Sequence, residues 1–115
     1  MKGRKHMRLK NLTDCEQLVM KTLWDAEREL SLMEITQRVN ETYHKDWKPQ
    51  TVSTFLARLV GKSFLESHRQ GRLFFYRILV LQEDYVGEMA ERFIAFWNRG
   101  SVEDFLATLE KWRTK

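Results

Sequence analysis

The chain has 115 residues, of which 43% are hydrophobic and 31% are charged, with one proline and one cysteine. This balance is typical of a globular domain and excludes collagen-like and low-complexity chains. No apolar run approaches the ~20 residues that cross a bilayer. The basic N-terminus lacks the apolar stretch of a secretory signal, and one cysteine cannot form an intrachain disulfide, so we expect a cytoplasmic protein without membrane insertion.

The net charge of +4 is spread unevenly. It is +5 over residues 1–12, −4 over 13–43, +5 over 44–80 and −2 over 81–115. A basic arm and a basic middle beside acidic segments favour a surface that binds a polyanion, although ordinary solvated surface gives the same pattern. The basic side chains of the arm either follow a DNA backbone or form a solubilising tail, and they are Lys2, Arg4, Lys5, Arg8 and Lys10.

Three short helices are predicted in the first half of the chain. Thr13 and Glu16 form a capping box ahead of the first, and Ser31 and Glu34 form one ahead of the second. Pro49 suits the first turn of the third helix, because its missing N–H has no helical partner there. The predicted buried stripes are Cys15, Leu18, Val19, Thr22, Leu23 and Ala26, then Leu32, Ile35, Val39 and Tyr43, then Val52, Phe55, Leu56, Leu59 and Val60.

Two β-prone runs follow at 64–68 and 73–78, joined by a polar turn at 69–72. A fourth helix is predicted from about Glu83 to Gly100, and a fifth from Ser101. This order predicts an α+β fold that is mainly α with a small β-hairpin. It is the order of a winged helix-turn-helix DNA-binding domain, at 11–80, followed by a helical dimerisation region, at 81–115.

The polar side of the third helix carries small or hydrogen-bonding side chains and no acidic residue, which favours insertion into the major groove of DNA over a merely solvated helix. Arg69 and Arg72 flank the glycine at the hairpin tip and are expected to hold phosphates. Arg77 and His68 lie nearby, and for them a phosphate contact is the weaker interpretation. The predicted DNA-binding residues are Lys48, Gln50, Thr51, Ser53, Thr54, Arg58, Arg69 and Arg72.

The two short helices predicted in the last third of the chain carry many apolar side chains. The unit that precedes them already has its own core, so it cannot cover both helices. A homodimer interface would cover this surface. The alternative is packing against the first helix, where Met20 and Trp24 lie off the main stripe. The predicted dimerisation residues are Tyr85, Met89, Phe93, Trp97, Phe105, Leu109 and Trp112.

Catalysis and metal binding are not expected, and neither is a cofactor. The three histidines, His6, His44 and His68, are too far apart in sequence to match the spacing of zinc ligands. No Gly-rich phosphate loop or nucleophile elbow is present. Cys15 lies on the predicted buried stripe, which favours a small core residue over a reactive thiol.

The chain resembles the BlaI/MecI/CopY (penicillinase repressor) family of winged-helix transcriptional repressors. The resemblance covers about residues 11–110 and depends on the runs LTDCE at 12–16, VMKTLW at 19–24, TVSTFLARL at 51–59 and GRLFFY at 71–76, with Gly100-Ser101-Val102 before the last helix. It implies a cytoplasmic homodimer that binds a palindromic operator and blocks transcription. By the same resemblance Thr51, Thr54 and Arg58 meet the operator, and the C-terminal helices of two subunits interlock.

The resemblance also implies a membrane-bound sensor protease as a partner that releases the repressor in the β-lactam-responsive members. Those members are cut at an Asn-Phe bond, and this chain has no Asn-Phe pair. The copper-responsive members end in a Cys-x-Cys cluster, whereas Cys15 is the only cysteine here. An alternative function, from a different class, is a winged-helix protein-interaction module that does not bind DNA.

Overall fold

The computed structural model describes residues 8–115 and divides them into two compact units. The first spans Leu9–Gln82, and the second includes Glu83–Lys115. The described residues form five helices and a three-stranded antiparallel sheet, which confirms the α+β prediction. Lys2, Arg4 and Lys5 of the basic arm lie outside the described residues.

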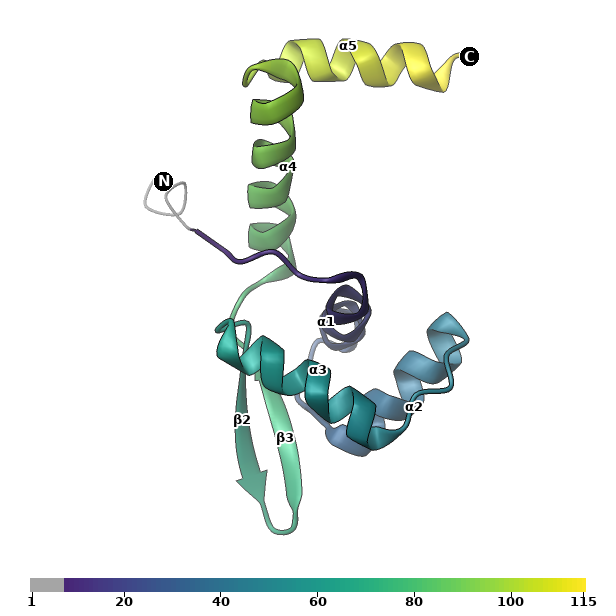
Figure 1. Cartoon of the computed structure of the whole chain (residues 1–115), viewed down its shortest axis with the longest axis vertical. Helices are drawn as coiled ribbons and strands as arrows, with labels where there is room; N and C mark the ends of the chain where they lie inside the picture. The colour runs from purple at the N-terminus through teal and green to yellow at the C-terminus, as the bar shows by residue number, and fades with distance from the viewer. Residues whose placement is uncertain (1–7) are drawn as a thin grey trace. The chain divides into compact units, whose positions relative to one another are not determined.

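Three helices make up most of the first unit (Figure 1). They are α1 (Asp14–Ala26), α2 (Leu32–Tyr43) and α3 (Pro49–Gly61). Both predicted capping boxes are present, because each capping hydroxyl accepts from the glutamate N–H three residues on and each glutamate bonds back to the cap. Pro49 stands in the first turn of α3, as predicted. Local sequence therefore sets where each of these helices begins.

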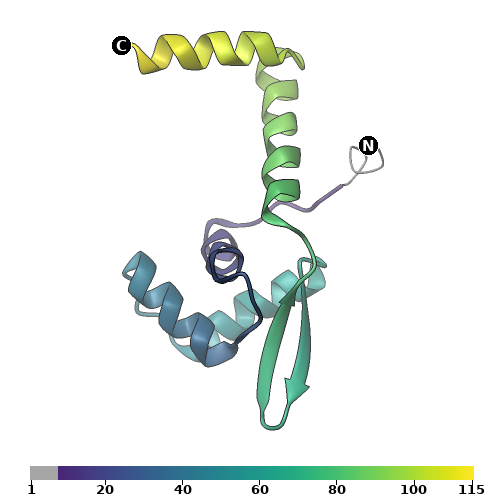
Figure 2. The same cartoon turned by 180° about the vertical axis from the view of Figure 1, so that it is seen from behind.

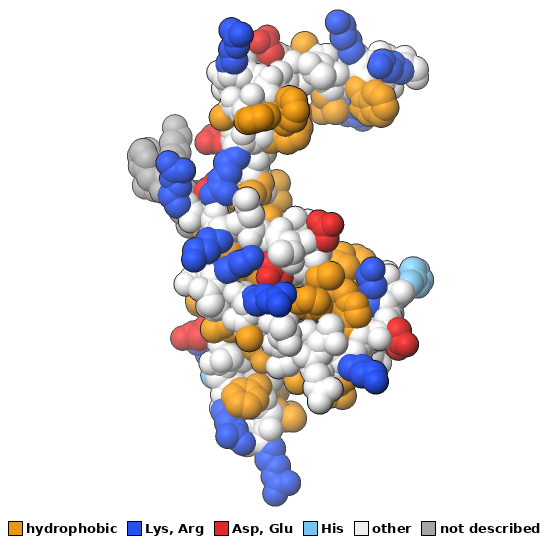
Figure 3. All heavy atoms as spheres, in the orientation of Figure 1, with side chains coloured by type: hydrophobic (Ala, Val, Ile, Leu, Met, Phe, Trp, Pro, Cys, Tyr) orange, Lys and Arg blue, Asp and Glu red, His pale blue; other side chains and the backbone are white. Residues whose placement is uncertain are grey.

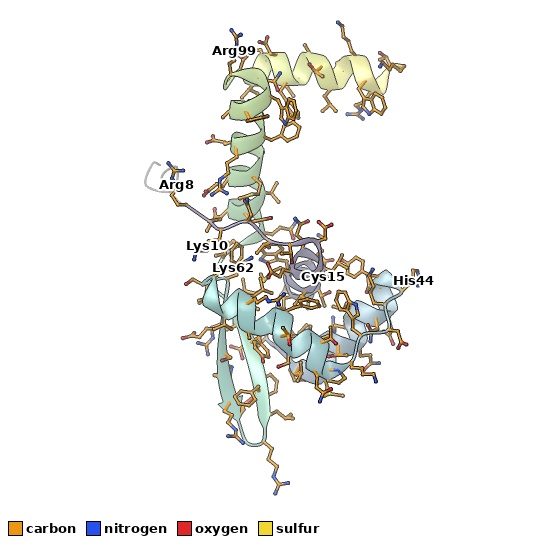
Figure 4. The ribbon with its side chains drawn as sticks, viewed as in Figure 1. Arg8, Lys10, Cys15, His44, Lys62 and Arg99 are labelled. Atoms are coloured by element: carbon orange, nitrogen blue, oxygen red, sulfur yellow. The ribbon has the colours of Figure 1, made fainter. Side chains whose placement is uncertain are left out.

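The core of this unit lies where α1 packs against both α2 and α3. This double contact makes the buried surface of α1 wider than the single stripe predicted for it. Met20 and Glu16, which were not on that stripe, are buried, whereas Cys15 is only half-buried. The prediction of Cys15 as a core residue is thus corrected, and Figure 4 shows its place on α1. The fully buried apolar side chains include Val19, Leu23, Leu30, Ile35, Val39, Val52, Leu56, Leu59 and Phe64.

The hairpin strands are β2 (Leu65–Gln70) and β3 (Leu73–Ile78), and Figure 2 shows them projecting beside the helices. The turn between them is shorter than predicted, because Arg69 and Gln70 continue the ladder and pair with Phe74 and Leu73. A third strand, β1 (Leu30–Ser31), pairs with β3 and was not predicted. Two residues are too few to leave an alternating pattern in the sequence.

The segment after β3 is fastened to α1. The indole Nε1 of Trp24 donates a hydrogen bond to the carbonyl oxygen of Val80 at 2.8 Å, and the Val80 side chain is buried. Met20 is completely buried within the chain. Trp24, which also lies off the predicted stripe of α1, therefore contacts the segment after β3.

The second unit contains α4 (Gln82–Asn98) and α5 (Val102–Arg113). As predicted, a glycine ends α4, since Gly100 has a φ of +84° and its N–H reaches the carbonyl oxygen of Ile94 at 3.1 Å. The Ser101 hydroxyl then caps α5. Neither these two helices nor any other in residues 8–115 has the length and apolar character needed to cross a membrane.

Candidate nucleic-acid interface

The polar side of α3 is open to solvent. Lys48, the N-cap residue, is exposed, and so are Gln50, Thr51, Thr54 and Arg58, whereas Ser53 is half-buried. The opposite side is fixed in the core by Val52, Leu56 and Leu59. Because no acidic residue lies on α3, phosphates could approach this side without meeting a negative charge on the helix.

One hydroxyl on this surface already has a partner in the helix. The Oγ1 of Thr54 donates to the carbonyl oxygen of Gln50 at 3.1 Å. Its hydrogen is therefore used within the helix, and its lone pairs are what it offers to a ligand. Thr54 consequently suits acceptance from a base amino group better than donation to a phosphate.

The start of α3 is positioned by two residues that the sequence analysis did not single out. The side-chain amide of Asn40 brackets the backbone of Trp47, accepting from its N–H at 3.0 Å and donating to its carbonyl at 2.9 Å. The Trp47 ring packs on Phe55 of α3, with centroids 5.1 Å apart. This clamp holds the residue next to Lys48 and so sets the direction in which α3 begins. The only signals of this clamp in the sequence were an asparagine near the end of a predicted helix and a tryptophan among charged residues.

The hairpin presents two exposed arginines near its turn. Gly71 has a φ of +66°, a backbone conformation that glycine adopts without strain, and Arg72 follows it. Arg69 lies on β2 rather than in the turn, opposite Phe74. Both arginines are exposed. Figure 3 shows basic side chains gathered at the end of the hairpin, next to a hydrophobic patch.

The other two basic residues of the hairpin are engaged by carboxylates. Glu29, which precedes β1, bonds His68 Nε2 at 2.6 Å and Arg77 Nε at 2.8 Å, and Arg77 also bonds Glu66 at 2.8 Å. These bonds, led by that from His68, hold the pKa of Glu29 below its ordinary value. The cluster fastens the hairpin to the segment after α1. The charge of Arg77 is balanced within the chain by Glu29 and Glu66.

The far end of α3 is tied to the start of α1 through a buried carboxylate. Lys62, which ends α3, bonds Glu16 at 2.6 Å and the Asn11 carbonyl oxygen at 2.8 Å. Figure 4 shows Lys62 beside the segment that leads into α1. Burial raises the pKa of Glu16, but the hydrogen bonds from Lys62 and from the Thr13 N–H outweigh it and leave the pKa lowered. The side chain is only 1% exposed, so its charge depends on Lys62.

The predicted dimerisation residues differ in exposure. Trp97 and Trp112 are each 66% exposed, and Phe93 and Leu109 are also exposed, while Met89 and Phe105 are half-buried and Tyr85 is buried. The rings of Phe93 and Phe105 meet edge to face at 5.8 Å and connect α4 to α5. Phe96, which the prediction left out, is 75% exposed. The second unit thus carries a run of uncovered aromatic side chains.

No group of three or more His, Cys, Asp or Glu residues within 8–115 could hold a metal ion. Cys15 is the one cysteine of the described residues, and it forms no disulfide.

Comparison with known proteins gives a family match over nearly the whole chain. The family model described as "Penicillinase repressor" matches residues 12–113. The penicillinase repressor of Bacillus licheniformis is 26% identical over 99 residues, which cover 86% of this chain and 75% of that protein. The methicillin resistance regulatory protein MecI of Staphylococcus aureus (strain N315) is 28% identical over 83 residues, which cover 72% of this chain and 65% of MecI.

A solved structure of a protein bound to DNA matches about two thirds of the chain. It is the solution structure of the monomeric form of Bacillus licheniformis BlaI in complex with the blaP half-operator. The two chains are 31% identical, with a TM-score of 0.55, and the match covers 68% of this chain and 92% of that one.

Proposed function

We propose, since this chain belongs to the penicillinase repressor family, that it is a DNA-binding transcriptional repressor that acts as a homodimer on a palindromic operator. The family consists of transcriptional repressors rather than enzymes. The observation that carries the proposal is the exposed, acid-free side of α3 beside a basic hairpin, in a chain that is 31% identical to a repressor solved on a half-operator.

In this proposal α3 enters the major groove and the hairpin is the wing. Gln50 and Arg58 have the amide and guanidinium groups that pair with base edges, and Thr51 and Thr54 add hydroxyl oxygens. Lys48, Arg69 and Arg72 neutralise phosphates, which fixes the protein on the duplex without selecting a sequence. Ser53, half-buried on the flank of α3, completes the proposed contact surface.

The proposed homodimer forms through the second unit. The exposed rings of Trp97 and Trp112 and the side chains of Phe93 and Leu109 are the apolar surface that a second copy would cover. Tyr85, Met89 and Phe105 complete the proposed set. Two-fold pairing would place two copies of α3 on two half-sites, which is why a palindrome is the proposed target.

The proposed location is the cytoplasm, where operator DNA is found. The family resemblance also supports a membrane-bound sensor protease as the partner that releases the repressor. Because no Asn-Phe pair is present, such a protease would have to cleave this chain at a different bond.

Two substitutions test the proposal that α3 contacts the bases while the wing contacts phosphates. Arg58→Ala is expected to weaken binding to a duplex selected by the protein from a random pool by ~1–3 kcal/mol, and to change binding to unselected DNA much less. Arg72→Ala is expected to weaken both about equally and to reduce the salt slope by about two, because each subunit of the dimer loses one phosphate contact. Fluorescence anisotropy with the two duplexes measures this. An equal loss on both duplexes for Arg58→Ala would make Arg58 a phosphate contact and contradict its assignment to the bases.

A further inference from the structure

An exposed aromatic ring supports one of the two wing arginines. Phe74 on β3 is 47% exposed although it is a large apolar residue. The guanidinium carbon of Arg69 lies 5.3 Å from the centroid of its ring, and the two residues stand directly opposite each other in the β2–β3 ladder. This is a cation–π contact between cross-strand neighbours. It fixes the position of a side chain that would otherwise be free to adopt many rotamers.

The side of the hairpin on which this pair lies follows from the register. Residues opposite each other share a face, and every second pair along the ladder lies on the same face. Arg69 and Phe74 therefore share a face with the Ser67–Tyr76 and Leu65–Ile78 pairs. Tyr76 and Leu65 are buried, and β2 packs against α3. The pair thus continues the core side of the hairpin, the side of α3, beyond the end of the core.

The contact also determines which atoms of Arg69 remain available. A guanidinium that lies over a ring keeps the N–H groups along its edge, and these are the groups that bind a phosphate. The contrast within the hairpin is with Arg77, whose N–H groups are bonded to Glu29 and Glu66. The two arginines lie on the same hairpin, but one is paired with carboxylates and the other is supported by a ring.

We infer that Phe74 is a positioning residue for DNA binding, which holds the Arg69 guanidinium on the α3 side of the wing so that it contacts a phosphate of the duplex that α3 enters. The inference rests on the proposed function. It assigns Phe74 an indirect role, through Arg69, rather than a contact of its own with DNA.

A double-mutant cycle tests this role without an identified operator. The probe is a mixed-sequence duplex of about 20 base pairs, two helical turns, titrated by fluorescence anisotropy with the full chain. Phe74→Leu, which keeps an apolar side chain but removes the ring, is expected to weaken binding about two- to fivefold, the effect of losing an exposed cation–π contact. In the Arg69→Ala background the same substitution is expected to cause no further loss. Phe74→Tyr, which keeps the ring, is expected to bind like the wild type.

The matched control is Leu73→Ala, the neighbouring exposed apolar residue on the opposite face of the same strand, which is expected to leave affinity unchanged. Thermal unfolding of each variant shows that the fold is retained. An equal loss for Phe74→Leu in both backgrounds would mean that Phe74 acts directly, and no loss in the wild-type background would mean that it does not position Arg69. Either result overturns the inference. Failure of the wild-type chain to bind would instead overturn the proposed function.

Discussion

Replacing Trp97 and Trp112 together by alanine is expected to lower the affinity for a selected palindromic duplex by about 10²–10⁴-fold, although neither residue is proposed to touch DNA. A single winged-helix unit that depends on phosphate contacts binds near the non-specific level, ~10⁻⁴–10⁻⁶ M at physiological salt. Joining two units makes the second contact intramolecular, and this gain disappears when the dimer dissociates. Both indoles are 66% exposed, so the substitution removes candidate interface area without opening a cavity in the core.

Sedimentation measures the dimer population, and fluorescence anisotropy on the same samples measures the affinity for the duplex. The matched control is Glu91→Ala with Lys111→Ala, which changes two exposed polar residues on the same two helices and leaves the net charge unchanged. It is expected to leave both dimer population and affinity unchanged. A tryptophan double variant that stays dimeric, or becomes monomeric with wild-type affinity, would contradict the coupling between dimerisation and DNA binding.

Glu16→Ala is expected to destabilise the first unit by about 2–4 kcal/mol. The substitution removes half of the capping box of α1 and also the buried partner of Lys62, so that a partly buried ammonium is left without its carboxylate. Urea unfolding measures the loss. Glu34→Ala is the matched control, because Glu34 forms the same capping box on α2 but pairs with the exposed Arg28. Its expected cost is on the order of 1 kcal/mol. Equal losses would mean that the Lys62 pair adds nothing.

The same pair gives stability a pH dependence of known sign. The pKa of Glu16 is lower in the folded chain than its ordinary value, so its contribution is present above the ordinary carboxyl range and is lost as the pH falls through the lowered pKa. Glu16→Gln keeps an oxygen for the Thr13 N–H but cannot titrate. The difference in stability between wild type and Glu16→Gln is therefore expected to shrink as the pH falls below the ordinary carboxyl range.

Features that depend on a few neighbouring residues could be predicted from the sequence. The two capping boxes, Pro49 at the start of α3 and Gly100 at the end of α4 are of this kind. Each is a local rule linking side chain to backbone, and tertiary packing did not override any of them.

Features that depend on distant residues could not be predicted. Glu16 was assigned to a cap, but its second role needs Lys62, 46 positions away. Glu29 bonds residues 39 and 48 positions further on, and neither spacing leaves a periodic signal. The hairpin length was misjudged because Arg69 and Gln70 are polar. Their place in the ladder depends on pairing with Phe74 and Leu73 rather than on their own β-propensity.

The central claim is that α3 and the wing form a DNA-binding surface, and the dependence of binding on salt tests it most directly. Lys48, Arg69 and Arg72 are proposed to meet phosphates in each subunit, about six contacts in a dimer. The affinity for mixed-sequence duplex is therefore expected to fall about 10³-fold between ~50 and ~200 mM salt. A protein-interaction module that does not use this surface would show no binding, or binding that salt leaves unchanged, and that result would contradict the account.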